Sequence, residues 1–184
     1  GAVSYAKQWR AIAEEIKADV LANGVDSRGV LTQTYGSTAL DASLLLVVLT
    51  RFLPADDPRV RATVMAIAEE LTEDGLVLRY RTEETDDGLS GAEGTFTICS
   101  FWLVSALVEI GEVSRAKHLC ERLLSFASPL HLYAEEIEPR TGRHLGNFPQ
   151  AFTHLALINA VVHVIRAEEE ADSTGGFQPA NAPM

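Results

Sequence analysis

Three glutamates stand close together in the segment from Leu132 to His154, beside a loop rich in proline and glycine. Glu135, Glu136 and Glu138 have tyrosine and phenylalanine residues near them in the sequence, and the loop leads into an apolar stretch. A carboxylate in a partly desolvated aromatic cleft can serve as a general base, because burial and neighbouring groups tune its pKa. A solvated surface loop explains the same charges more simply, and composition alone favours that explanation.

The composition describes one globular domain. The chain has 184 residues, of which 47% are hydrophobic, so it can bury a core. Fifteen basic against 26 acidic side chains give a formal net charge of −11. This charge disfavours nucleic acid and anionic membranes as partners and is compatible with a neutral ligand such as a sugar. No uninterrupted apolar run is long enough to span a bilayer.

Cysteine and histidine show no pattern typical of a metal site. Cys99 and Cys120 lie in apolar helical patterns, where small buried hydrophobic residues are expected rather than a disulfide or a metal site. The five histidines show no metal-ligand spacing, so we expect neither a metal nor another cofactor. Two unpaired cysteines favour a cytoplasmic location.

Hydrophobic periodicity predicts six helices and almost no strand. Amphipathic helices alternate with helices that are apolar on nearly all sides. The expected helices span residues 5–22, 39–52, 57–71, 95–110, 113–127 and 149–166. Three helical hairpins, each with one buried and one surface member, indicate a two-layer α/α array. Residues 1–167 are the expected folded domain, and the charged, then Gly/Pro/Ala-rich residues 168–184 are an expected disordered tail.

The loops alternate in the same way as the helices. Those that lead into the apolar helices are long and polar and span residues 33–38, 79–94 and 133–149, whereas the others are short. If the apolar helices run parallel, these three loops meet at one end of the array, at the helix N-termini. Long polar loops on one face of a rigid scaffold are the usual place for a functional site.

Four motifs between residues 5 and 166 carry a family resemblance. They are Tyr-Gly-Ser-Thr-Ala-Leu-Asp-Ala-Ser-Leu-Leu (35–45), Gly-Leu-Val-Leu-Arg-Tyr (75–80), Gly-Ala-Glu-Gly-Thr-Phe with Cys-Ser-Phe-Trp-Leu (91–96, 99–103), and Ala-Glu-Glu-Ile-Glu-Pro-Arg-Thr-Gly with Gly-Asn-Phe-Pro-Gln-Ala-Phe (134–142, 146–152). In this order they resemble the C-terminal half of bacterial glycoside hydrolase family 15 enzymes, the group of glucoamylases, glucodextranases and some actinobacterial trehalases. The resemblance implies an (α/α)6 barrel, of which three hairpins are about half.

The resemblance also implies inverting hydrolysis of α-linked glucose. One carboxylic acid protonates the leaving oxygen, and a second carboxylate, roughly 6.5–9.5 Å away, activates water. Glu135 matches the general base, because the family pattern places the base first in the Glu-Glu pair. Arg79 matches an arginine that hydrogen-bonds sugar hydroxyls. The other expected substrate-binding residues fall in the pocket-lining segments: Tyr35, Glu93, Glu136 and Phe152.

One part of the family pattern is missing. The general acid of the family lies upstream, in a segment similar to Gly-Ile-Trp-Glu, and no segment of this chain resembles it. Loss of one of two cooperating groups forfeits a factor of about 10²–10⁴. We therefore expect this chain alone to be inactive and a longer parent protein to hydrolyse α-glucosides. The abrupt start on a helix at Gly1 fits a truncation.

A free-standing α/α half-barrel that acts as a protein-interaction module is the alternative. A half-barrel exposes apolar edges on its first and last hairpins, and such patches bind partners or self-associate. Self-association through that edge is expected under either interpretation. Retention of Glu135, Arg79 and the long loops favours the enzyme, because a pure scaffold does not need them.

Overall fold

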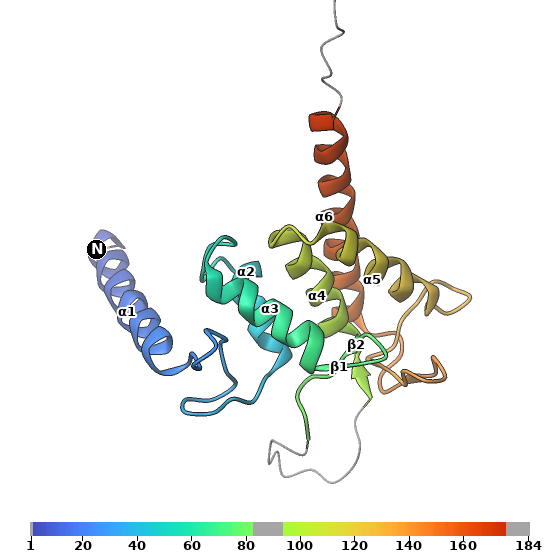
Figure 1. Cartoon of the computed structure of the whole chain (residues 1–184), viewed down its shortest axis with the longest axis horizontal. Coiled ribbons are helices and arrows are strands. Elements are labelled where there is room, and N and C mark those ends of the chain that lie inside the picture. The colour runs from blue at the N-terminus through green and yellow to red at the C-terminus, as the bar shows by residue number, and fades with distance from the viewer. Residues whose placement is uncertain (1, 83–93, 176–184) are drawn as a thin grey trace, which may run out of the picture.

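The computed structural model of the chain describes residues 2–82 and 94–175. Within those ranges the chain forms six α-helices, one short 3-10 helix and five strands of two residues each (Figure 1). The prediction of an all-α fold with almost no strand is confirmed.

Helix α4 (Thr97–Glu109) lies at the centre of the packed helices. It packs against α2 (Leu46–Leu49) on one side and α6 (Ala151–Gly175) on the other. The amphipathic helices α3 (Pro58–Glu70) and α5 (Val113–Ser125) also pack on α4. The apolar helices therefore form an inner row with amphipathic helices outside it, as the alternating pattern predicted.

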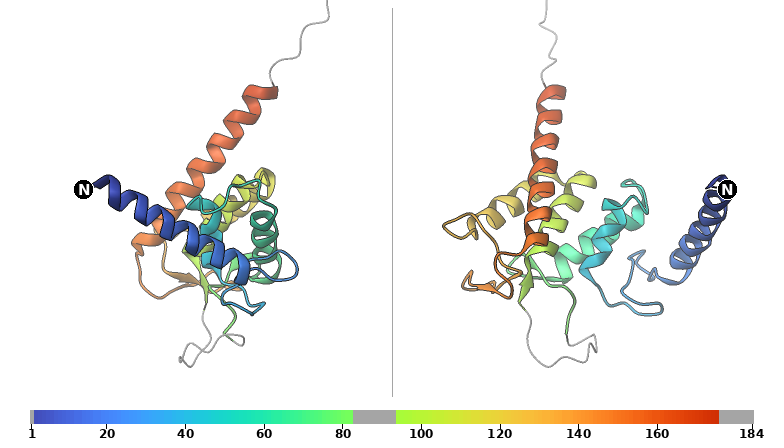
Figure 2. Two further views of the ribbon diagram at one scale, coloured as in Figure 1. Left: turned by 90° about the vertical axis from the view of Figure 1, so that its left-hand side faces the viewer. Right: turned by 180° about the vertical axis from the view of Figure 1, so that it is seen from behind.

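Helix α1 (Ala2–Asn23) stands apart from this row, at the edge beyond α2 and α3 (Figures 1 and 2). Only its C-terminal turns are attached to the body. Val20 packs against the core, and the Tyr35 hydroxyl donates a hydrogen bond of 2.8 Å to the Asp19 carboxylate. The N-terminal turns project away with their apolar stripe in solvent, so the two ends of the row, α1 and the α5–α6 pair, face outward.

Local signals explain where α3 begins and how the chain turns after it. The Asp57 carboxylate accepts a hydrogen bond of 2.9 Å from the Arg59 N–H, and Pro58 occupies the first turn. After α3, strands β1 (Thr72–Glu73) and β2 (Leu76–Val77) form a hairpin. Its two turn residues, Asp74 and Gly75, both have positive φ, as a tight hairpin turn requires.

The expected helix over residues 39–52 is much shorter than its apolar run suggested. Residue 41 is extended, because Asp41 pairs with Tyr80 in an isolated β-bridge. The Asp41 carboxylate then accepts a 2.7 Å hydrogen bond from the Ser43 N–H and caps the 3-10 helix η1 (Ala42–Leu45). Helix α2 ends at Leu49, and Arg51 has a φ of 62° that no helix tolerates. The expected length was wrong because tertiary pairing overrides the apolar periodicity.

Helix α6 is longer than expected. It continues to Gly175, so residues 168–175, assigned from the sequence to a disordered tail, are helical. Glutamate is a good helix former, and no glycine or proline interrupts residues 151–174, so polarity alone does not end the helix. Residues 176–184 lie outside the described part, and the division into domain and tail stays a prediction.

Aromatic contacts organise the core around α4. Phe101 of α4 meets the Tyr133 ring edge to face, with centroids 5.7 Å apart, and both side chains are buried. The Tyr133 hydroxyl donates a hydrogen bond of 3.1 Å to the Leu123 carbonyl, and burial raises the pKa of Tyr133 to about 12. Cys99 and Cys120 are free and buried, as expected. Among the described helices, none is long and apolar enough to cross a membrane.

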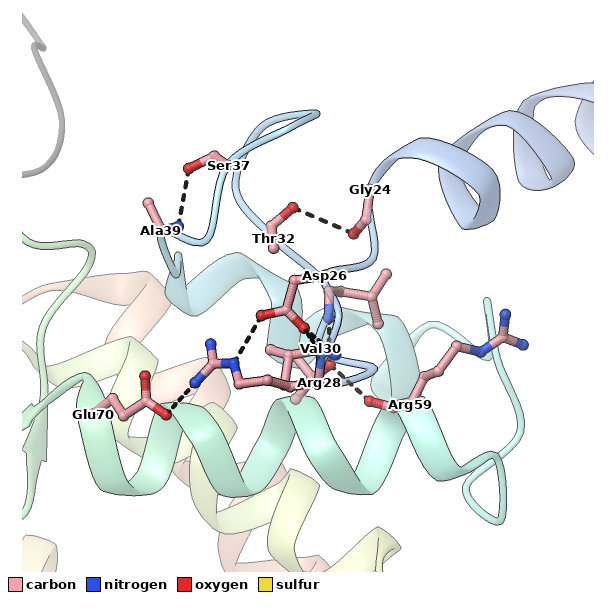
Figure 3. A network of polar contacts seen from close by, with 11 residues as sticks. Gly24, Asp26, Arg28, Val30, Thr32, Ser37, Ala39, Arg59 and Glu70 are labelled. Atoms are coloured by element: carbon pink, nitrogen blue, oxygen red, sulfur yellow. Dashed lines mark hydrogen bonds and ion pairs between the residues drawn. The ribbon is translucent and has the colours of Figure 1, made fainter.

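Asp26 fastens the loop after α1 to α3 (Figure 3). Its carboxylate accepts hydrogen bonds from the Arg28 guanidinium and N–H, both at 2.8 Å, and from the Val30 N–H at 3.0 Å. Arg28 continues to Glu70 at the end of α3, 2.7 Å away. Burial opposes ionisation of Asp26, but the Arg28 side chain and the two backbone donors outweigh it, so the pKa of Asp26 is lowered.

Replacement of Asp26 by alanine should lower the free energy of unfolding by about 1–3 kcal/mol at pH 7, because two backbone donors and a guanidinium lose their acceptor. Since the pKa is depressed in the folded state, the contribution is present above the unfolded pKa of about 3.9 and is lost as the pH falls below it. Urea unfolding of Asp26→Ala at pH 7 and pH 3 measures the loss of unfolding free energy and its dependence on pH. Asp56→Ala, at an exposed site next to α3, is the matched control and should leave the unfolding free energy unchanged at both pH values.

Candidate active site

The long loops meet at the N-terminal ends of the inner helices. The bridge between Asp41 and Tyr80 joins the loop before η1 to the segment after β2. Strands β3 (Thr95–Phe96), β4 (Glu136–Ile137) and β5 (His144–Leu145) form one antiparallel ladder, which joins the entry to α4 to the entry to α6. Parts of all three loops therefore lie at one end of the helix array, as predicted (Figure 1).

The segment that carries Glu135 is held from both sides by backbone hydrogen bonds. The Glu135 carbonyl accepts a hydrogen bond of 3.0 Å from the N–H of Thr97, the first residue of α4. The Glu135 N–H donates one of 3.0 Å to the Asn147 carbonyl. Two neighbouring residues anchor the same segment to α6, because the Gln150 N–H bonds the Tyr133 carbonyl and the Thr153 hydroxyl bonds the Ala134 carbonyl. Glu135 thus stands between the N-termini of two inner helices.

The Glu135 carboxylate lies in a small cradle formed by residues 146 and 147. Its Oε2 atom accepts hydrogen bonds from the Asn147 N–H at 3.2 Å and from the Asn147 side-chain amide at 3.0 Å. Gly146 has a φ of 70°, and a Cβ atom there would lie 2.8 Å from the same Oε2. Only glycine lets the carboxylate occupy this place. The other oxygen, Oε1, has no hydrogen bond to any of the described residues, and the residue is half-buried.

The neighbouring glutamates have structural partners. The Glu136 carboxylate accepts a hydrogen bond of 2.8 Å from the Gly94 N–H and so fixes the start of β3. Glu138 closes the turn after β4, and a hydrogen bond from the Thr141 hydroxyl holds the pKa of Glu138 below its usual range. Successive side chains along a strand point to opposite sides, so Glu135 and Glu136 serve different surroundings. Glu136 and Glu138 thus hold β3 and the turn after β4 in place, whereas the Glu135 carboxylate is held by Asn147.

Arg79 lies beside strand β3, which pairs with the strand that begins at Glu136. Its guanidinium stands over the Phe96 ring at 5.1 Å and over the Tyr80 ring at 4.5 Å, and it donates a hydrogen bond to the Tyr80 hydroxyl. Phe96 in turn pairs with Glu136 in the ladder. Stacking on two rings and the hydroxyl contact hold the guanidinium in one orientation at the same end of the molecule as Glu135.

The remaining expected substrate-binding residues have different outcomes. Phe152 stands in the first turn of α6 beside the Glu135 segment, and its ring is 66% exposed. Tyr35 is placed against α1, where its hydrogen bond to Asp19 raises the pKa of Tyr35. Its hydroxyl is therefore held by a contact that the sequence did not signal. Glu93 lies outside the described residues.

A pocket of about 650 Å³ lies next to this region, between residues 26–40 and the end of α3. Glu70, Arg28 and Arg81 line it, with Ser37 and Thr38 from one of the family-like motifs. The sequence did not single out Asp26, Arg28 or Arg81. Glu135 is not part of its wall, so this pocket and the carboxylate cradle are separate features. Among the described residues, no group of three or more His, Cys, Asp and Glu side chains could hold a metal ion.

Sequence comparison gives a consistent family assignment. A profile of glycosyl hydrolases family 15 matches residues 1–162. Over all 184 residues the chain is 90% identical to a trehalase of Mycolicibacterium smegmatis and 87% identical to a trehalase of Mycobacterium tuberculosis. A trehalase of Thermoplasma volcanium is 42% identical over 154 residues, 83% of this chain. The chain spans only 28% and 27% of the two mycobacterial relatives and 24% of the archaeal one.

Solved structures of glycosidases have a similar fold. A wild-type glycosidase superposes with a TM-score of 0.70 at 25% sequence identity, covering 84% of this chain and 43% of that chain. A variant of a glycosidase in complex with glucose superposes with the same TM-score at 24% identity.

Gly146→Ala should displace the Glu135 carboxylate, because the new methyl group would lie 2.8 Å from Oε2. Gly111→Ala is a matched control, since Gly111 also has positive φ (82°) but has no atom within 4 Å of an added Cβ. Both should lose about 1 kcal/mol of stability from backbone strain. Only Gly146→Ala should shift the ¹³C NMR signal of the Glu135 carboxyl carbon. An unchanged signal would refute the cradle.

Proposed function

The chain belongs to glycosyl hydrolases family 15, and on that premise we propose that it carries the general-base side of an active site that hydrolyses α-linked glucose with inversion. The observation that carries the proposal is the Glu135 carboxylate, held by Asn147 at the N-terminal end of the inner helices. One of its oxygens is occupied by donors and the other is directed to no described partner.

An inverting hydrolase needs these features from its base. The carboxylate must accept a proton from water while it keeps a fixed place opposite the leaving group. The two hydrogen bonds from Asn147 keep the carboxylate from rotating and leave Oε1 to bind the water. Arg79, fixed by its ring contacts, would donate hydrogen bonds to sugar hydroxyls. The exposed ring of Phe152 offers an apolar face to the sugar, and Glu93 and Tyr35 remain proposed contacts on sequence grounds.

The proposed general acid lies outside this chain. A Gly-Ile-Trp-Glu-like segment is lacking from the 184 residues, and the relatives are more than three times as long as the chain. We infer that the three hairpins are about half of an (α/α)6 barrel and that the other half supplies the acid and the rest of the sugar pocket. The relatives named trehalase make trehalose the first substrate to test.

The thiols favour a reducing compartment. Burial raises the pKa of Cys99 to about 12, and burial also raises the pKa of Cys120. Both are protonated, shielded and unpaired, and cytosolic proteins commonly keep thiols in this state. The cytoplasm is therefore the location that we propose.

The purified 184-residue chain should release no glucose from trehalose or maltose. Without the acid and half the pocket, the loss exceeds the factor of about 10²–10⁴ that one missing group causes. A coupled glucose assay with overnight incubation measures this. Turnover by the isolated chain would contradict the assignment of the acid to another segment.

A chimaera tests the role of Glu135. The matching segment of the Mycolicibacterium smegmatis trehalase, 90% identical to this chain, is replaced by the chain itself. In this protein Glu135→Gln should lower kcat by about 10³-fold or more with little change in KM, because only proton acceptance is lost. Glu136→Gln is the matched control and should lose stability rather than kcat.

Rescue by a small anion distinguishes a general base from a residue that only binds the substrate. In Glu135→Ala, azide can enter the vacated space and attack the sugar without deprotonation, so added azide should restore turnover and give a glycosyl azide. Near-normal kcat in Glu135→Gln, or a large loss of kcat in Glu136→Gln alone, would move the base to Glu136.

A further inference from the structure

Tyr133, Gln150 and His154 form a closed cycle of hydrogen bonds close to Glu135. The Gln150 N–H donates a hydrogen bond of 3.0 Å to the Tyr133 carbonyl. The Nδ1 atom of His154 lies 2.7 Å from the Gln150 carbonyl oxygen. The Tyr133 N–H in turn donates a hydrogen bond of 3.3 Å to the Nε2 atom of His154. The cycle therefore ties both backbone groups of Tyr133 to the start of α6.

The partners of His154 determine where its ring carries a proton. A carbonyl oxygen can only accept a hydrogen bond, so Nδ1 must carry the proton that the Gln150 carbonyl receives. A backbone N–H can only donate, so Nε2 must be unprotonated to accept from Tyr133. His154 is therefore the neutral tautomer with its proton on Nδ1. The other neutral tautomer would set two donors against each other at Nε2 and two acceptors at Nδ1.

A second histidine packs on Tyr133 but is bonded elsewhere. The His144 ring is stacked on the Tyr133 ring with centroids 6.3 Å apart, whereas the His154 ring meets it edge to face at 5.9 Å. The Nε2 atom of His144 lies 2.8 Å from the Phe126 carbonyl oxygen, so this nitrogen must carry a proton. His144 is thus bonded to the end of α5, while His154 is bonded to the segment that leads to Glu135.

The backbone carries the placement of Tyr133 directly to Glu135. The Tyr133 ring is buried, and its hydroxyl is held by the Leu123 carbonyl. With the side chain fixed at that end and both backbone groups fixed by the cycle, Tyr133 cannot rotate freely. Ala134 alone separates Tyr133 from Glu135 along the chain, and the Thr153 hydroxyl holds the Ala134 carbonyl at 3.2 Å.

We propose, on the premise that Glu135 is the general base, that His154 is a positioning residue for it and acts by accepting the Tyr133 N–H at its unprotonated Nε2 atom. Displacement of a reacting group by about 1 Å can cost about 100-fold in rate. Loss of the Nε2 acceptor frees one of the two backbone groups that fix Tyr133, so the Glu135 carboxylate loses its exact place. All these contacts join residues of this chain, so the cycle does not depend on the segment that completes the barrel.

The tautomer can be measured in the unaltered 184-residue chain, so this test does not depend on the folding of any variant. Long-range ¹H–¹⁵N NMR spectra distinguish a protonated ring nitrogen from an unprotonated one. At about pH 8.5, above the range in which histidine ordinarily titrates, His154 should carry its proton on Nδ1. His144 should carry its proton on Nε2 and is the control in the same spectrum. A proton on Nε2 of His154 would overturn the proposal.

Two amide side chains of different length test the Nε2 acceptor in the chimaera described above. The amide of His154→Gln reaches the place of Nε2 and can accept the Tyr133 N–H, whereas the shorter amide of His154→Asn reaches only the place of Nδ1. His154→Asn should lower kcat by about 10–100-fold with little change in KM, and His154→Gln should keep at least about a third of kcat. His118→Asn, at an exposed site on α5, is the matched control and should keep the wild-type kcat.

The ¹³C NMR signal of the Glu135 carboxyl carbon separates the role of His154 from that of Glu135. In the 184-residue chain, which needs no turnover, His154→Asn should shift this signal and His154→Gln should leave it in place. If Glu135→Gln keeps a near-normal kcat, the assignment of the base fails, and this signal still decides whether His154 places the carboxylate. If Glu135→Gln loses kcat and His154→Asn does not, the role of His154 alone is refuted.

Two further results would overturn the proposal. Equal losses of kcat in His154→Gln and His154→Asn would show that the volume of the ring matters and its Nε2 acceptor does not. Lower resistance to urea in His154→Asn with an unchanged kcat would make His154 a contact that only stabilises the fold.

Discussion

The ladder of β3, β4 and β5 is the contact that holds the candidate site together. Six residues from three segments pair there, at the point where α4 begins. Glu135 directly precedes β4, Phe96 of β3 supports Arg79, and Gly146 and Asn147 directly follow β5. A change in ladder register by one residue would exchange the directions of Glu135 and Glu136. The chemistry of the site therefore depends on a sheet of only two residues per strand.

Contacts with α4 anchor the ladder. The N–H of Thr97, the first residue of α4, donates a hydrogen bond to the Glu135 carbonyl. One turn later in α4, Phe101 packs against Tyr133, which lies two residues before Glu135. The same buried contacts thus serve the core and the site. The Asp41–Tyr80 bridge positions Arg79, which directly precedes Tyr80. Each inner helix therefore contributes its N-terminal end to one polar surface.

Much of this could be predicted from the sequence, for physical reasons that can be named. Hydrophobic patterning identified α1, α3, α4 and α5 to within a few residues, because α1, α3 and α5 each have a regular apolar face, α4 is apolar on nearly all sides, and Asp57-Pro58 marks the start of α3. The alternation of apolar and amphipathic helices placed the long loops at one end. The length of α2 could not be predicted, since it depends on the pairing of Asp41 with Tyr80, 39 residues later in the sequence. The placement of Tyr35 depends likewise on Asp19, and the Gly146–Asn147 cradle on a left-handed residue whose role appears only beside Glu135.

The stereochemistry of hydrolysis tests the central claim most directly. In the chimaera that contains this chain, proton NMR in the first minutes of reaction distinguishes α-glucose from β-glucose before they interconvert. If a base activates water opposite the leaving group, trehalose gives one β-glucose for each α-glucose. Release of α-glucose alone would mean retention through a covalent intermediate, and Glu135 would then not be the base of an inverting hydrolase.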